Sequence, residues 1–136
     1  MIGVVIVAHG GLAREYLAAV EHVLGKQPGM KAISIGVNED RRAKSIEIRN
    51  AADEVDQGQG VVVVTDMFGG SPSNLSMPAC AGAQRRILYG ANLPMLIKLT
   101  KSRDEPLNTA VELALEAGRK YIDSLNVTDE SIAEIP

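Results

Sequence analysis

The sequence has few side chains that can do chemistry. Its 136 residues include two histidines, one cysteine, one phenylalanine, three tyrosines and no tryptophan. A single cysteine excludes an intrachain disulfide and a cysteine-rich metal site. With so small a set, the place of each reactive side chain in the fold decides what the protein can do.

Charge and hydropathy exclude further classes of protein. Fourteen lysines and arginines against 17 aspartates and glutamates give a formal net charge of -3, which offers no basic field for nucleic-acid binding. No apolar run reaches the ~18 residues of a membrane span. The first residues, Met1-Ile2-Gly3-Val4, lack the basic segment of a signal peptide. We therefore expect a globular protein in the cytoplasm, with an apolar fraction of 46% to form its core.

Apolar runs rich in branched residues alternate with runs of helical periodicity. Residues 2–8, 32–37, 61–64 and 87–89 are typical of short buried strands. Helical patterns cover residues 12–24, about 40–57, about 71–81, 95–100 and about 107–125. This alternation predicts an α/β fold, a three-layer sandwich with a mainly parallel four-stranded sheet, for which we assume the flavodoxin-like order 2-1-3-4.

No linker, repeat or low-complexity segment divides the chain. Residues 1–125 are expected to form a single domain. Residues 126–136 are polar with scattered branched side chains. We expect this tail either to be disordered or to add a strand at an edge of the sheet.

Two chemically useful side chains follow strands that the predicted topology makes neighbours. His9 follows the first strand and Asp66 the third. Ligands of open α/β sheets bind beyond the carboxyl ends of the strands where the winding reverses, which here is between the first and third strands. A carboxylate accepting a hydrogen bond from Nδ1–H would leave the lone pair of the imidazole on Nε2. His9 and Asp66 are therefore the candidate catalytic residues.

The loops after these two strands are suited to a phosphate-like anion. Two glycines after the histidine run directly into a helix, and a Gly-Gly-Ser segment precedes another. Helix N-termini favour negative charge, and glycines allow the backbone to approach a ligand closely. The serine can donate a hydroxyl hydrogen bond or cap its helix. The candidate phosphoryl-binding residues are Gly10, Gly11, Gly69, Gly70 and Ser71. No metal or cofactor is expected, and no nucleotide P-loop motif is present.

The remaining candidates have ordinary structural explanations. His22 lies inside a helical pattern, and Cys80 in a short apolar helix, where it is expected to be a small buried residue. The charged run from Glu39 to Arg49 is interpreted as a solvated helix face with local ion pairs. Met67 and Phe68, next to the predicted site, are candidates for a docking surface.

Attack of His9 Nε2 on a phosphoryl group would give a phosphohistidine, with backbone donors holding the phosphoryl oxygens. Two alternatives stay open at this stage. Ser71, His9 and Asp66 are the residue types of a hydrolase triad. Alternatively, phosphorylation of His9 would regulate binding to a target protein.

Four segments match a known family. They are Ala8-His9-Gly10, residues 64–74 (VTDMFGGSPSN), residues 90–96 (GANLPML) and residues 116–119 (EAGR). Over about the first 125 residues the chain resembles the IIA domain of the mannose-type family of the bacterial sugar phosphotransferase system.

The resemblance implies that His9 takes a phosphoryl group from the phosphorylated histidine-containing phosphocarrier protein and passes it to a IIB component, and that Asp66 orients His9. It also implies a homodimer that exchanges a C-terminal antiparallel strand, and an indirect association with the membrane through permease components. Gly11 stands where larger residues are common, which predicts a more open rim. No IIB domain is present in the sequence, so the acceptor is expected to be another chain.

Overall fold

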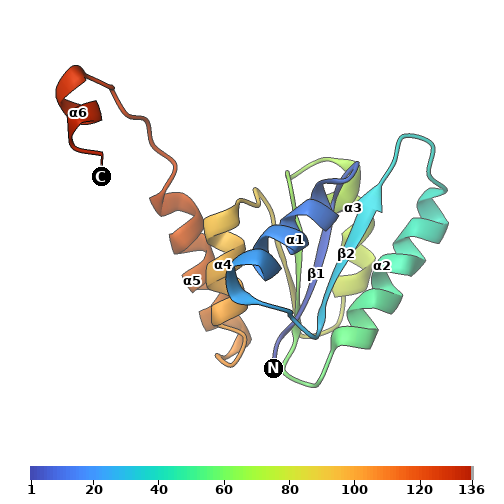
Figure 1. The fold of residues 1–136 in the computed structure, drawn as a ribbon. Helices are drawn as coiled ribbons and strands as arrows, with labels where there is room; N and C mark the ends of the chain where they lie inside the picture. Colours follow the sequence, from blue (N-terminus) through green and yellow to red (C-terminus); the bar gives the residue numbers. More distant parts are fainter. Residues whose placement is uncertain (136) are drawn as a thin grey trace.

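The structure, a computed structural model, describes residues 1–135. Within this range one sheet of parallel strands forms in the order β2-β1-β3-β4, with helices on both faces (Figure 1). The predicted fold class and strand order are therefore confirmed. The strands are β1 (Gly3–His9), β2 (Met30–Ile35), β3 (Val61–Thr65) and β4 (Arg85–Leu88).

The two central strands are buried on both faces, which explains their unbroken apolar sequences. All of β3, and all of β1 before His9, is buried. Alternate side chains of β1 and β3 enter two separate cores: Ile6 and Val64 lie in one, and Val7 and Val63 in the other. A strand buried on both sides cannot carry polar residues on either face without unpaired polar groups.

Helices cover each core (Figure 1). On one face the sheet packs against α1, α4 and α5, and on the other against α2 and α3. None of the helices within residues 1–135 combines the length and the apolar character needed to cross a membrane. The helices are α1 (Leu12–Leu24), α2 (Arg41–Val55), α3 (Ser71–Cys80), α4 (Leu93–Lys101), α5 (Leu107–Lys120) and α6 (Asp129–Ala133).

The structure shifts several predicted boundaries. α5 ends at Lys120, although the apolar periodicity continues to Leu125. Tyr121, Ile122 and Leu125 are 65%, 73% and 75% exposed, because the chain leaves the domain at this point and none of them reaches the core (Figure 1). β2 ends at Ile35 rather than residue 37, and β4 covers residues 85–88 rather than 87–89, since pairing with β1 and β3 ends there.

No strand forms between residues 121 and 135. The segment instead contains the short helix α6, whose N-cap Thr128 accepts a hydrogen bond from the Ser131 N–H at 3.2 Å. Asp129 and Glu130 in its first turn complement the helix dipole, which favours a helix over the edge strand that was one of the two expectations for this tail. Exchange of a strand between subunits stays a prediction, and Pro136 lies outside the described residues.

Two of the family-like segments join α4 to α5. The Asn92 side chain caps α4 by accepting from Met95 N–H at 3.0 Å and donates to the Gly118 carbonyl at 2.9 Å. A Cβ on Gly118 would lie 3.1 Å from Met95 Cβ, which is too close for unstrained packing. These residues position the helices and lie outside the chemistry described below.

Candidate functional site

His9 and Asp66 meet at the carboxyl ends of the two central strands. β1 and β3 are neighbours, with Val7 opposite Thr65, so the chain leaves both strands side by side. His9 Nδ1 lies 2.7 Å from Asp66 Oδ2, and the same oxygen accepts the His9 backbone N–H at 3.1 Å. The fold thus brings together the two residues that the sequence placed at this switch point.

The surroundings of Asp66 favour its ionised form. Burial raises the pKa of Asp66, but hydrogen bonds from the ring and backbone of His9, together with the charge of that ring, outweigh it and lower the pKa below its ordinary value of 3.8. The second carboxylate oxygen accepts the Met67 N–H at 3.0 Å. An ionised Asp66 that accepts from Nδ1–H selects the tautomer of His9 whose lone pair lies on Nε2.

Gly70 lies against the Nε2 edge of the imidazole. A Cβ on Gly70 would lie 3.2 Å from His9 Cε1 and 3.5 Å from His9 Nε2. The φ of Gly70 is -90°, which any residue can adopt, so the close approach of the imidazole rather than backbone conformation favours glycine here. The His9 side chain is 49% exposed, beside the start of α3.

Two helices begin beside the pair without a side-chain cap. Gly11 is the N-cap of α1 and Gly70 that of α3, and neither N-terminus has a side-chain hydrogen bond. In contrast, Asp40 caps α2 and Asn92 caps α4. The N–H groups in the first turn of α1, and those in the first turn of α3 apart from Pro72, which has none, are therefore left for solvent or a bound anion.

Other predicted loop residues use their N–H groups within the protein. Gly10 N–H donates to the Ile35 carbonyl at 2.9 Å, and Gly69 N–H donates to Ser73 Oγ at 3.0 Å. The φ angles of Gly10 and Gly69, +56° and +86°, are those that favour glycine, so both residues shape the loops. The predicted residues whose N–H groups have no protein acceptor in the described part of the chain are Gly11, Gly70 and Ser71.

Ser71 does not cap its helix. Gly70 is the N-cap, and Ser71 is the first residue of α3. Its Oγ accepts a hydrogen bond from Arg41 Nη1 at 3.2 Å. In the sequence, Arg41 looks like its charged neighbours, and the run was therefore interpreted as a solvated helix face. The topology distinguishes Arg41 from the other charged residues of this run. It is the first residue of α2, which follows β2, and β2 is the neighbour of β1, the strand that carries His9.

Tyr16 is a second residue whose role the sequence pattern missed. Its hydroxyl donates to the Ala91 carbonyl at 3.0 Å, and Ala91 N–H donates to the Thr65 carbonyl at 3.1 Å. Burial raises the pKa of Tyr16, and the charge of Asp66 raises it further. Tyr16 thus ties α1 to the segment beside the end of β3, and it stays a neutral hydrogen-bond donor.

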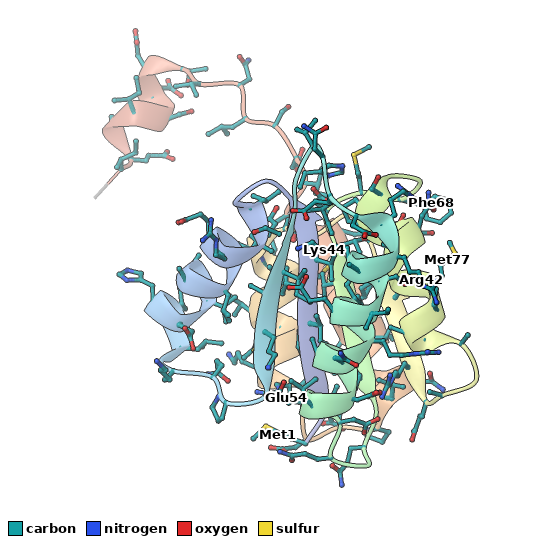
Figure 2. All side chains as sticks on the ribbon, turned by 90° about the vertical axis from the view of Figure 1, so that its right-hand side faces the viewer. Met1, Arg42, Lys44, Glu54, Phe68 and Met77 are labelled. Atoms are coloured by element: carbon teal, nitrogen blue, oxygen red, sulfur yellow. The ribbon has the colours of Figure 1, made fainter. Side chains whose placement is uncertain are left out.

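Exposed apolar side chains flank the site. Met67, Phe68 and Tyr89 are 55%, 61% and 52% exposed, and the rings of Phe68 and Tyr89 are 4.8 Å apart between centroids. Phe68 stands out from the loop before α3 (Figure 2). An exposed aromatic pair of this kind is typical of a surface that contacts another protein.

The site combines one nucleophilic nitrogen, one carboxylate and several hydrogen-bond donors. Among residues 1–135 no three His, Cys, Asp or Glu side chains gather as a metal-binding group would. A nitrogen lone pair beside the uncapped start of a helix suits the acceptance of a phosphoryl group.

Comparisons with known proteins point to one family. A family model described as "PTS system fructose IIA component" matches residues 3–115. The mannose-specific EIIAB component of the phosphotransferase system of Escherichia coli K12 is 28% identical over 127 residues, which are 91% of this chain and 39% of that protein. The chain therefore spans about two fifths of the length of the curated relatives of this type.

Solved structures agree in fold. The phosphotransferase system component EIIA from Streptococcus agalactiae matches with a TM-score of 0.76 and 26% identity, over 91% of this chain and 97% of that one. The mannose/sorbose-specific IIA subunit from Enterococcus faecalis has a TM-score of 0.83 at 21% identity, over 94% and 97% of the two chains. The second similarity concerns the fold alone.

We predict that Asp66→Asn lowers the free energy of unfolding in a pH-dependent way. The lowered pKa of Asp66 means that its ionised form stabilises the fold above the ordinary value of 3.8, and that this contribution is lost as the pH falls through the lowered pKa. Urea unfolding at pH 7 and at pH 3 is expected to show a wild-type advantage that shrinks with acid. An advantage of equal size at both pH values would contradict an ionised Asp66.

Proposed function

Because the chain belongs to the mannose-type IIA family of the sugar phosphotransferase system, we propose that it carries a phosphoryl group on His9 Nε2. IIA components are phosphocarriers of that system. The observation that carries the proposal is the 2.7 Å contact between His9 Nδ1 and Asp66 Oδ2, which leaves Nε2 beside the uncapped start of α3. No transport substrate contacts this site in the proposed role.

The proposed donor is the phosphorylated histidine-containing phosphocarrier protein, and the acceptor is a IIB component. The lone pair of His9 Nε2 forms a bond to phosphorus while the bond from phosphorus to the donor imidazole breaks and its electron pair returns to the donor nitrogen. Asp66 stabilises the positive charge that develops on the His9 ring. N–H groups at the start of α3 and the Ser71 hydroxyl hold the phosphoryl oxygens. In the second transfer a nucleophile of the acceptor attacks phosphorus. The bond from phosphorus to His9 Nε2 breaks, and its electron pair returns to Nε2.

The hydrolase alternative has less support. A triad needs the serine hydroxyl to hydrogen-bond the histidine that activates it. Ser71 Oγ accepts from Arg41 instead, and no hydrogen bond joins Ser71 to His9 within residues 1–135. We therefore assign Ser71 to phosphoryl binding rather than to nucleophilic attack.

Phe68, Tyr89 and Met67 supply the surface on which donor and acceptor would dock in turn. Their side chains are exposed at the loop that follows Asp66 and at the residue after β4, and the net charge of -3 does not favour a polyanionic partner. The proposal places this exchange in the cytoplasm, with the membrane reached only through permease components. A regulatory role would use the same surface, with a target protein in place of the IIB component.

We predict that His9→Ala abolishes phosphoryl acceptance and that His22→Ala does not. His22 is an exposed residue of α1 and makes no contact with the site, so it is the matched control for loss of an imidazole. Each variant is incubated with phosphoenolpyruvate and the general phosphotransferase proteins, and the mass of the intact protein is measured. The wild type and His22→Ala are expected to gain one phosphoryl group. A phosphorylated His9→Ala variant would refute the assignment.

We also propose a homodimer that uses the outer edge of β4. β4 pairs with β3 alone within the described residues, and a hollow of about 380 Å³ lies between this edge and α5. The segment after α5 exposes Tyr121, Ile122 and Leu125, which an edge pairing with a second copy would cover.

We predict that a chain ending at Lys120 is monomeric while the full chain is dimeric, measured by sedimentation equilibrium. None of residues 121–135 belongs to either core, so thermal unfolding of the shortened domain tests whether it stays folded. Equal masses for the full and the shortened chain would rule out a dimer that depends on the tail.

A further inference from the structure

We propose that the Arg41 guanidinium is a phosphoryl-binding group of this site and acts together with Ser71. The inference rests on the proposed function of His9. It adds a cationic side chain from α2, an element that contributes no other group to the site.

Arg41 reaches the phosphoryl-binding loop directly. Its Nη1 donates to Ser71 Oγ at 3.2 Å. Ser71 follows Gly70, the residue whose added Cβ would lie 3.5 Å from His9 Nε2. Arg41 is therefore joined through one side chain to the backbone that lies against the nucleophilic nitrogen.

Helix packing holds Arg41 in this place. Ser45, one turn after Arg41 on α2, donates to the carbonyl of Leu75, one turn after Ser71 on α3, at 3.3 Å. The two helices thus make matching contacts one turn apart, with Arg41 and Ser71 at the end nearest the site. Arg41 is the first residue of α2 and follows the Asp40 cap. The cap and the contact between the two helices therefore fix where the Arg41 side chain starts.

The guanidinium is not engaged by an acidic partner in residues 1–135. Lys44, on the same helix, pairs with Glu39 and Glu47, and the ion pairs found in this part of the chain do not include Arg41. The Asp40 carboxylate accepts from the Ala43 N–H at the helix start. A guanidinium has five N–H donors, and Ser71 uses one of them, so the others can bind a second acceptor.

A cation at this site would stabilise a bound phosphoryl group. The phosphoryl group would bring up to two negative charges close to Asp66, which is already ionised. The free N–H groups at the helix starts carry only partial charges. A guanidinium supplies a full charge and binds phosphate oxygens with two parallel N–H groups. Within residues 1–135, Arg41 is the cationic side chain that hydrogen-bonds to the start of α3, through Ser71.

Arg41 also prepares Ser71 as a donor. Because Ser71 Oγ accepts from Arg41, its own hydrogen is free to point toward a phosphoryl oxygen. A hydroxyl that accepts from a cation becomes a stronger donor. The Arg41 and Ser71 side chains would hold the phosphoryl group together with the free N–H groups at the start of α3.

The test compares Arg41→Ala with Arg42→Ala. Arg42 is the next residue on α2, is exposed (Figure 2), and its loss changes the net charge equally, so it is the matched control. Both variants and the wild type receive phosphoryl groups from the phosphorylated carrier protein and, separately, from phosphoramidate, a small donor that needs no docking surface. Arg41→Ala is expected to be phosphorylated about tenfold more slowly with both donors, which is the loss of one charge-assisted hydrogen bond. Arg42→Ala is expected to match the wild type, and Arg41→Lys to lie between.

A second measurement separates phosphoryl binding from a structural role. The ³¹P NMR signal of phosphorylated His9 is titrated with pH in the wild type and in Arg41→Ala. A guanidinium that binds the phosphoryl oxygens favours the doubly charged form, so its removal is expected to raise the pKa of the phosphoryl group. A merely structural Arg41 would leave that pKa unchanged.

Three results would overturn the inference: equal rates for Arg41→Ala and the wild type, slowing with the protein donor alone, or an unchanged phosphoryl pKa. Slowing with the protein donor alone would assign Arg41 to docking. Failure of the proposed function is distinct, because then the wild type itself gains no phosphoryl group on His9 from either donor.

Discussion

The hydrogen bond between His9 Nδ1 and Asp66 Oδ2 is the contact on which the rest of the site depends. It exists because β1 and β3 are neighbours: Thr65, the last residue of β3, lies opposite Val7, so Asp66 leaves β3 beside the end of β1 at His9. The same carboxylate oxygen accepts the His9 backbone N–H, so the ring and the end of β1 are held by one group. Burial of a carboxylate is unfavourable in itself, and these hydrogen bonds offset it.

The fold supports this contact in two ways: the buried central strands hold it rigidly, and the helix starts around it offer N–H donors. The central strands are packed on both faces, which leaves the strand ends little freedom to move. Three helices start near the strand ends beside His9, and only α2 among them is capped by a side chain. Gly70 keeps the imidazole edge open. The scarcity of reactive side chains is therefore compatible with the proposed phosphoryl binding, because backbone N–H groups would provide most of the hydrogen-bond donors.

The sequence predicts whatever depends on periodicity and topology. Strand–helix alternation predicts the parallel sheet, and the strand order assumed for it, which the structure has, places His9 near Asp66. The local sequence pattern does not predict features that depend on a partner from another part of the fold. The apolar spacing continues past Lys120 although the chain has left the core, and Gly10 donates to a carbonyl on β2 that no local pattern identifies. Arg41 and Arg42 look alike in sequence, and only the packing of α2 on α3 distinguishes them.

The most direct test of the account is the position of the phosphoryl group on the His9 ring. Two-bond proton–nitrogen NMR spectra of the phosphorylated, ¹⁵N-labelled protein identify which ring nitrogen is bonded to phosphorus. The account predicts a phosphorus-bonded Nε2 and an Nδ1 that keeps its proton, hydrogen-bonded to Asp66. Phosphorus on Nδ1, or on any residue other than His9, would contradict it.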